Sequence, residues 1–321
     1  MRRLLLLAFL VTLALPAAAS ARLVVGISDN HPAMLSDPLF ADLGAEHVRL
    51  VVSWDAMAAR AKGDNEISDR VEPYVAAADE AGAEVMVAFE HHRGAPVNCA
   101  TSRQPQCRLP SVAAYRRQVA KFVAAFPQVK YVTAWNEANH KAQPTFDHPR
   151  RAGQYAKAAD GVCRAAGTCR VVAMDLLDSA NDPKAPTRKL SYSRTTRYIG
   201  KLRRAYGRRP AICGIHNYAD VNRFRTAGTK ALARAMRCRS IWLTETGGIY
   251  HFASFWNRAM RRQAHCASAT ACQAKALRFL FEKTVTAARH IDRAYVYAFY
   301  SGTDREHDYG LVEGDGNAPG G

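Results

Sequence analysis

Short apolar runs rich in β-branched residues recur eight times along the chain, each bounded by polar or glycine-containing segments. Runs that are apolar on both faces are typical of strands buried in a parallel sheet. The eight runs cover residues 23–27, 48–52, 85–89, 131–135, 171–174, 211–215, 241–244 and 294–299.

Segments with the helical spacing of apolar residues separate these runs. The widest stripe precedes the eighth run and is formed by Leu277, Leu280, Phe281, Thr284 and Val285. A stripe of this width covers one face of a sheet. The repeated alternation of strand and helix predicts an α/β protein with one domain, a (β/α)8 TIM barrel over residues 22–313.

The end of the chain departs from a complete barrel. No helical stripe follows the eighth run, so we expect the eighth outer helix to be missing or truncated. A barrel of that kind has a groove between its first and last helices. Residues 314–321 are rich in glycine and are predicted to form a flexible tail.

The composition is that of a globular protein, with 48% hydrophobic and 23% charged residues, which excludes a disordered or fibrous chain. Lys and Arg total 45 against 28 Asp and Glu, a net charge of +17. We expect most of this excess on solvated helix faces, with attraction to an acidic polysaccharide or the cell envelope as the alternative. Nucleic acid is not an expected partner, because no aromatic-interleaved basic motif and no zinc module occurs.

Residues 1–21 have the pattern of a secretory signal peptide. Arg2 and Arg3 precede an apolar run over 4–15, and small residues follow at a possible cleavage site. The run is too short to span a bilayer comfortably, although a retained anchor stays the alternative. We therefore expect a secreted monomer, extracellular or in the cell envelope, without stable membrane insertion.

Export changes the interpretation of the eight cysteines. In an oxidising compartment an even number of cysteines favours disulfides over metal or redox chemistry, and no CxxC spacing occurs. Three pairs of cysteines are close in sequence, and the two cysteines that remain form the fourth pair. The predicted disulfides are Cys99–Cys107, Cys163–Cys169, Cys266–Cys272 and Cys213–Cys238.

Two carboxylates follow or end predicted strands at positions that face each other across such a barrel. Glu137 follows the fourth run by two residues and Glu245 directly follows the seventh. The active site of a (β/α)8 barrel forms at the carboxyl ends of its strands. A pair of carboxylates there can cleave a glycosidic bond, one protonating the leaving oxygen while the other attacks the sugar or activates water.

The segment Ala134-Trp135-Asn136-Glu137 resembles the fourth-strand motif of the clan A retaining glycoside hydrolases, the 4/7 superfamily, and Trp242-Leu243-Thr244-Glu245 is similar to the seventh-strand motif. The resemblance implies that Glu137 is the acid/base, that Asn136 hydrogen-bonds the sugar 2-hydroxyl and that Glu245 is the nucleophile. It implies a retaining β-glycosidase, acting without cofactor or metal on the O-glycosidic bonds of a poly- or oligosaccharide by double displacement. These roles require Glu137 to be protonated, in an apolar or anionic neighbourhood.

Three further segments resemble the same superfamily. Arg49 in the second run would keep the nucleophile ionised. His216 and Tyr218, after the sixth run, would orient the nucleophile and the proton donor. His91 and His92, after the third run, would lie near the scissile sugar.

The end of the eighth run departs from the superfamily pattern. The superfamily usually places a tryptophan there to stack on the sugar, whereas this chain offers only Phe299 or Tyr300. Trp54, at the end of the second run, is the tryptophan placed best for stacking. We expect Trp54 and Tyr300 to contact substrate.

Two other functions stay open. A carbohydrate-binding barrel without turnover would keep the same cleft. A metal-dependent barrel hydrolase would draw on His31, His91, His92, His216 and Asp304. A structural ion pair is the corresponding alternative for Arg49, with Glu46 or Asp29 as its partner.

Overall fold

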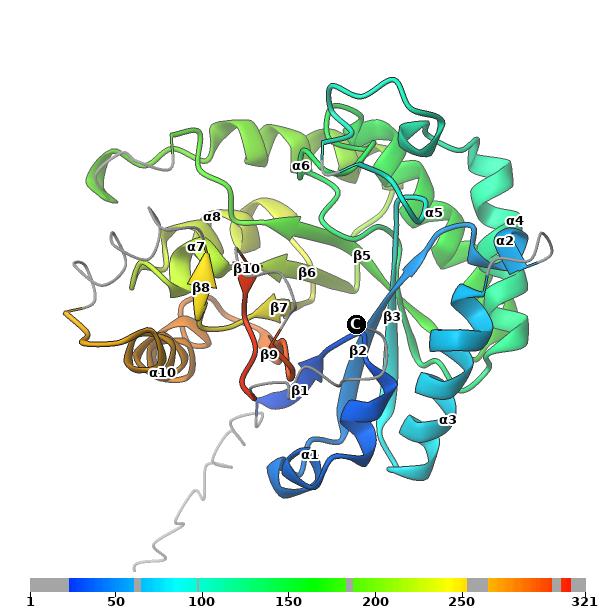
Figure 1. Cartoon of the computed structure of the whole chain (residues 1–321). Helices are drawn as coiled ribbons and strands as arrows, with labels where there is room; N and C mark the ends of the chain where they lie inside the picture. The colour runs from blue at the N-terminus through cyan, green and yellow to red at the C-terminus, as the bar shows by residue number, and fades with distance from the viewer. Residues whose placement is uncertain are drawn as a thin grey trace, which may run out of the picture.

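The computed structural model describes residues 23–60, 65–96, 98–182, 187–252, 265–301 and 307–312. In these residues eight parallel strands close into a barrel in the order β1-β2-β3-β4-β5-β6-β7-β9 (Figure 1). The barrel strands are β1 (Val24–Ser28), β2 (His47–Ser53), β3 (Glu84–Glu90), β4 (Tyr131–Thr133), β5 (Arg170–Leu177), β6 (Ile212–His216), β7 (Ser240–Thr246) and β9 (Ile291–Tyr297). Each predicted run corresponds to one of these strands, so the predicted barrel is confirmed.

Helices connect the strands and surround the barrel. They are α1 (Pro38–Leu43), α2 (Ala56–Arg60), α3 (Glu72–Glu80), α4 (Val112–Ala125), α5 (Pro149–Ala166), α6 (Ser193–Tyr206), α7 (Tyr218–Val221), α8 (Ala227–Met236) and α10 (Ala269–Phe279). The helix α4 shows why these segments fold as they do. The side chain of Ser111 caps its first turn by accepting from the backbone N–H of Ala114, and its buried face carries Tyr115, Val119 and Phe122.

Short irregular elements complete the described chain. Strands β8 (His251–Phe252) and β10 (His307–Asp308) pair antiparallel as a separate two-stranded sheet. Turns of 3-10 type cover Pro32–Ser36, Pro105–Cys107 and Thr187–Lys189, and π-helical turns cover Ile67–Val71 and Leu280–Thr284.

Side chains fill the barrel interior, as the fold requires. One buried cluster joins residues from five strands, namely Met86, Val172, Ile212, Trp242 and Tyr295. Arg293 lies beside this cluster, with its guanidinium carbon 4.2 Å from the centroid of the Trp242 ring. The interior is therefore packed, and the chemistry must lie at the barrel mouth.

A cavity of about 540 Å³ lies on the flank between α1 and the π-helical turn that follows α10. Its lining includes exposed Val25, Leu43 and Phe281. This is the position of the predicted groove. After β9, the described residues form β10 and loops but no helix. The missing eighth helix stays a prediction, because residues 302–306 and 313–321 lie outside the described part of the chain.

All four predicted disulfides are present. The bond between Cys213 and Cys238 joins β6 to the turn before β7, and the bond between Cys163 and Cys169 closes the turn between α5 and β5. Four disulfides are consistent with an extracellular protein. No helix among the described residues is long and apolar enough to cross a membrane. The predicted signal peptide and the predicted C-terminal tail lie outside these residues.

Candidate active site

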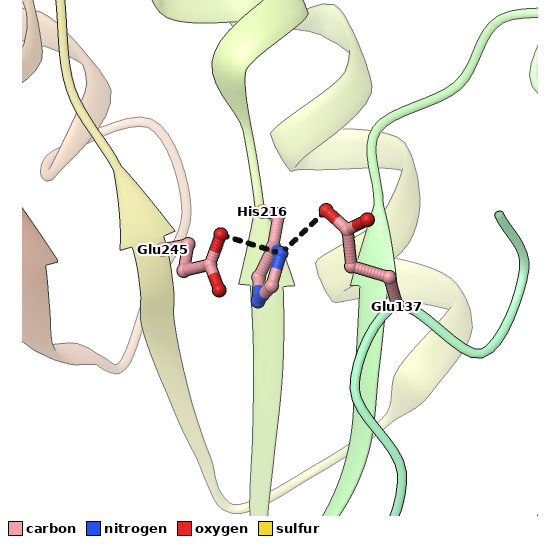
Figure 2. A group of neighbouring side chains, drawn as sticks. All are labelled: Glu137, His216 and Glu245. Carbon is pink, nitrogen blue, oxygen red and sulfur yellow. Dashed lines mark hydrogen bonds and ion pairs between the residues drawn. The ribbon is translucent and has the colours of Figure 1, made fainter. Parts of the chain in front are cut away.

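Five charged or titratable side chains meet at the mouth of the barrel. They come from or follow different strands: Arg49 on β2, Glu137 after β4, Asp175 on β5, His216 at the end of β6 and Glu245 on β7. Figure 2 shows the two glutamates on either side of the histidine ring. The barrel thus brings together residues that are far apart in sequence.

His216 bridges the two predicted catalytic carboxylates. Its Nδ1 lies 2.9 Å from Oε1 of Glu137 and 3.5 Å from Oε2 of Glu245. One oxygen of Glu137 and one of Glu245 lie within 4.8 Å of each other. The Glu137 side chain is 19% exposed and the Glu245 side chain 10% exposed, so a ligand can reach both. The carboxyl groups are about 5 to 5.5 Å apart in retaining glycosidases and about 6.5 to 9.5 Å apart in inverting ones.

The buried guanidinium of Arg49 holds three neighbouring groups. Its Nη1 donates to Oε1 of Glu245 at 2.5 Å, and its Nη2 donates to Oδ1 of Asn136 at 2.8 Å and to Oδ2 of Asp175 at 3.0 Å. An unpaired guanidinium at this depth would be costly, and these contacts offset most of that cost, although Nε is buried without a hydrogen-bond partner among the described residues. Arg49 therefore pairs with site residues and not with Glu46 or Asp29.

Asp175 is a site residue that sequence analysis missed, because the fifth run was ended one residue before it. Its carboxylate is fully buried, lies 2.9 Å from Nε2 of His216 and accepts a hydrogen bond from the hydroxyl of Thr244. Gly214 on β6 leaves room for this carboxylate, since a Cβ at position 214 would lie 2.4 Å from Oδ1 of Asp175. The sequence contained a signal for this residue, because Asp175 directly continues an apolar strand. A carboxylate in such a position needs buried partners.

The surrounding charges determine where the protons lie. Burial lowers the pKa of His216, but the carboxylates of Asp175 and Glu245 and the hydrogen bond to Glu137 raise it to about 10. Burial raises the pKa of Glu137, but the hydrogen bond and charge of His216, with His140 adding to them, outweigh burial and lower it. At neutral pH His216 is an imidazolium and Glu137 a carboxylate. The prediction that Glu137 is protonated is therefore wrong for the protein at neutral pH without substrate. The positive charge of His216 beside Glu137 favours the ionised carboxylate.

Tyrosines surround the other side of Glu245. The hydroxyl of Tyr218 donates to Oε2 of Glu245 at 3.2 Å, as its predicted orienting role requires. Tyr297, which sequence analysis missed, ends β9, and burial together with the charge of Glu245 raises the pKa of its hydroxyl. The Tyr309 ring lies 5.3 Å from that of Tyr218 and 5.6 Å from that of Tyr297, centroid to centroid.

Tyr300 and Phe299 lie beyond this group. The hydroxyl of Tyr300 donates to Asp37 at 2.7 Å, and its ring packs edge-on against His31. Phe299 is fully buried. The eighth barrel strand ends at Tyr297, two residues before the end of the predicted run, so Tyr297 is the residue of this strand that lies near Glu245.

Trp54 follows β2, and His92 follows β3. Trp54 is partly buried, and its backbone N–H donates to the carbonyl of Glu90 at 3.0 Å. Nε2 of His92 lies 3.6 Å from Oδ2 of Asp55.

Glu90, at the end of β3, is a site residue that sequence analysis did not predict. Burial raises its pKa, opposed by His91 and by a hydrogen bond from Asn136, so a fourth carboxyl group borders the site.

A family model described as cellulase (glycosyl hydrolase family 5) matches residues 28–273. The chain belongs to glycosyl hydrolase family 5. Membership makes it a glycoside hydrolase and confirms the resemblance to clan A. No curated protein matches the sequence.

Solved structures share the fold of this family 5 hydrolase at low sequence identity. A family 39 glycoside hydrolase from Bacteroides cellulosilyticus WH2 matches with a TM-score of 0.57 and 16% identity, over 90% of this chain and 60% of its own length. A β-glucosidase from Thermotoga maritima gives 0.56 and 10%, over 89% of this chain and 81% of its own. A GH5_18 variant from Bifidobacterium longum subsp. longum, in complex with Manb1-4GlcNAc, gives 0.55 and 16%, over 91% and 74%. These likenesses show the barrel fold.

Among the described residues, the histidines of the alternative metal site do not come together as one group of ligands. His31 contacts Asp29 at 2.7 Å, His92 contacts Asp55, and Asp304 lies outside the described residues. Within the described chain of the family 5 hydrolase, one group of three could hold a metal ion, and it consists of Glu137, His216 and Glu245. A metal would have to displace the proton of His216 there.

We expect His216 of the family 5 hydrolase to be protonated at pH 7 and to titrate near pH 10. The variant Asp175→Asn removes the first of the carboxylates that raise this pKa, so the histidine should titrate at lower pH. NMR titration of protein labelled with ¹⁵N at histidine measures both values. Asp79→Asn, on the exposed face of α3, is the matched control and should change nothing. A wild-type His216 titrating near 6.5, or no change in Asp175→Asn, would contradict the assignment.

Proposed function

We propose that the chain is a retaining β-glycoside hydrolase. Glu245 attacks the anomeric carbon and forms a glycosyl-enzyme, while Glu137 protonates the departing oxygen and then activates the water that releases the sugar. The observation that carries this proposal is the approach of the two carboxylates to within 4.8 Å at the barrel mouth. An inverting enzyme needs a wider gap to hold water between its carboxyl groups.

The contacts of Glu245 support its role as nucleophile. Arg49 donates to Oε1 and Tyr218 donates to Oε2, so both carboxylate oxygens have a defined direction. Such positioning lowers the entropic cost of attack on a bound sugar.

The proton for the leaving group lies on the pair formed by His216 and Glu137. Nδ1 of His216 donates to Oε1 of Glu137 at 2.9 Å, so one proton can pass along this bond as a glycosidic oxygen approaches Glu137. The proton then moves to the leaving oxygen as the C–O bond breaks and the bond to Glu245 forms. In the second step Glu137 removes a proton from water, which returns the pair to its starting state.

The remaining site residues are proposed sugar contacts. Asn136 uses its amide oxygen for Arg49, which leaves its amide N–H groups for Glu90 and the sugar 2-hydroxyl. Tyr297 supplies aromatic surface beside the nucleophile. Trp54, His92 and Tyr300 lie farther out, where additional sugar units would extend. We also propose that the protein is exported and acts as a monomer.

Aryl β-glycosides, neutral and acidic, test the two roles. Glu137→Ala should lose roughly 10²- to 10⁴-fold in hydrolysis, the usual contribution of an acid/base group. The loss should be smallest for the best leaving groups, which need little protonation. Glu245→Ala should be inactive, and added azide should restore formation of a glycosyl azide of inverted configuration. Retained hydrolysis in Glu245→Ala, or glycan binding by the wild type without turnover, would contradict the proposal.

The pH dependence of kcat/KM tests the source of the proton. The pair formed by His216 and Glu137 keeps its shared proton until His216 titrates. Activity should therefore persist through neutral pH and fall as the pH approaches about 10. Asp175→Asn should move this alkaline limb to lower pH, while Asp79→Asn should leave it in place. A limb that lies near pH 6 in the wild type and is unchanged in Asp175→Asn would show that His216 does not hold the proton.

A further inference from the structure

A cavity of about 430 Å³ lies beside the acid/base residue, between the loops after β4 and β5 and the first turns of α6. Its volume is within the range of about 300 to 1,000 Å³ that small-molecule sites occupy. His140 lines the cavity and places its Nδ1 3.5 Å from Oε2 of Glu137. The cavity therefore borders the proposed catalytic centre through His140.

The lining of this cavity is strongly positive. Lys141, Arg194, Arg197 and Lys201 line it, and Asp147 is the one carboxylate among the lining residues. In the described part of the chain, no carboxylate forms an ion pair with any of these four basic side chains. A concave surface with one sign of charge concentrates ligands of the opposite sign.

The position of the cavity beside Glu137 places it on the leaving-group side of the scissile bond in the proposed reaction. Oε1 of Glu137 faces His216, and Oε2 faces His140. In the proposed reaction Glu137 gives its proton to the leaving oxygen, so the saccharide attached to that oxygen lies on the Glu137 side. From there it extends past His140 into the cavity.

We propose that the cavity lined by Lys141, Arg194, Arg197 and Lys201 binds an anionic saccharide on the leaving-group side. The assignment of the side rests on the proposed function. Guanidinium groups bind carboxylate and sulfate oxygens with two parallel hydrogen bonds, which favours uronate or sulfated sugars over neutral ones. The substrate is thus an acidic glycan, cleaved so that a charged unit leaves first. Phe146 and Tyr198 add aromatic surface to the same cavity.

Calorimetric binding tests the proposal in a Glu245→Gln background, which prevents consumption of the ligand. The probes are a hyaluronan tetrasaccharide, which carries carboxylates, a chondroitin sulfate tetrasaccharide, which adds sulfates, and neutral chitotetraose. The cavity variant is Arg194→Gln, Arg197→Gln, Lys201→Gln. The matched control, Arg116→Gln, Arg117→Gln, Lys121→Gln, removes the same charge from the exposed face of α4.

We expect a charged probe to bind at least 10-fold more tightly than chitotetraose, and the cavity variant to lose at least 10-fold in Kd while the control keeps its affinity. The comparison of the two charged probes distinguishes carboxylate from sulfate recognition. Equal binding of chitotetraose, equal losses in both variants, or no binding of either charged probe would overturn the proposal.

Hydrolysis of aryl β-glycosides by the wild type separates this result from the proposed function. An aryl glycoside has no saccharide as its leaving group, so the cavity variant should cleave it with wild-type kcat/KM. Absence of all hydrolysis contradicts the catalytic proposal alone, and the binding comparison still decides whether the cavity recognises anionic sugars.

Discussion

The contacts of one buried cation organise the barrel mouth. The guanidinium of Arg49 donates to groups on or after four other strands, namely Glu245, Asn136, Asp175 and Ser28. Without it, three carboxyl groups would have His216 as their only cation within this cluster, and burying an uncompensated charge costs several kcal/mol per ion. The same contacts orient Glu245, the proposed nucleophile, and the amide of Asn136, which is proposed to hold the sugar. The requirement to pair a buried charge therefore fixes the geometry that the chemistry needs.

The second cation of the cluster, His216, gives the site a proton that can move. Its imidazolium contacts Glu137, Asp175 and Glu245, so two basic groups face three carboxyl groups. When all are ionised, the cluster carries one net negative charge, which suits a transition state with oxocarbenium character. Asp175 has no proposed contact with substrate. It acts by holding Arg49 and His216 in their positions and by keeping the histidine charged.

The strands, the disulfides and the two glutamates could be predicted because each depends on local signals. Apolar runs mark strands, short spacing marks cysteine pairs, and polar residues at strand ends mark the barrel mouth. Asp175 could not be found in this way, because its role depends on facing Gly214 across two neighbouring strands. Tyr297 was missed because the end of the eighth strand was placed two residues too late. The protonation of Glu137 depended on its distance from His216, which a sequence does not contain.

Covalent trapping of the nucleophile tests the central claim most directly. The protein would be incubated with 2-deoxy-2-fluoro analogues of the aryl glycosides that it cleaves, digested, and analysed by tandem mass spectrometry. The account predicts one fluorosugar per chain, attached to Glu245, and no label in Glu245→Gln. A label on another residue, or cleavage of the parent glycoside with inverted configuration, would contradict it.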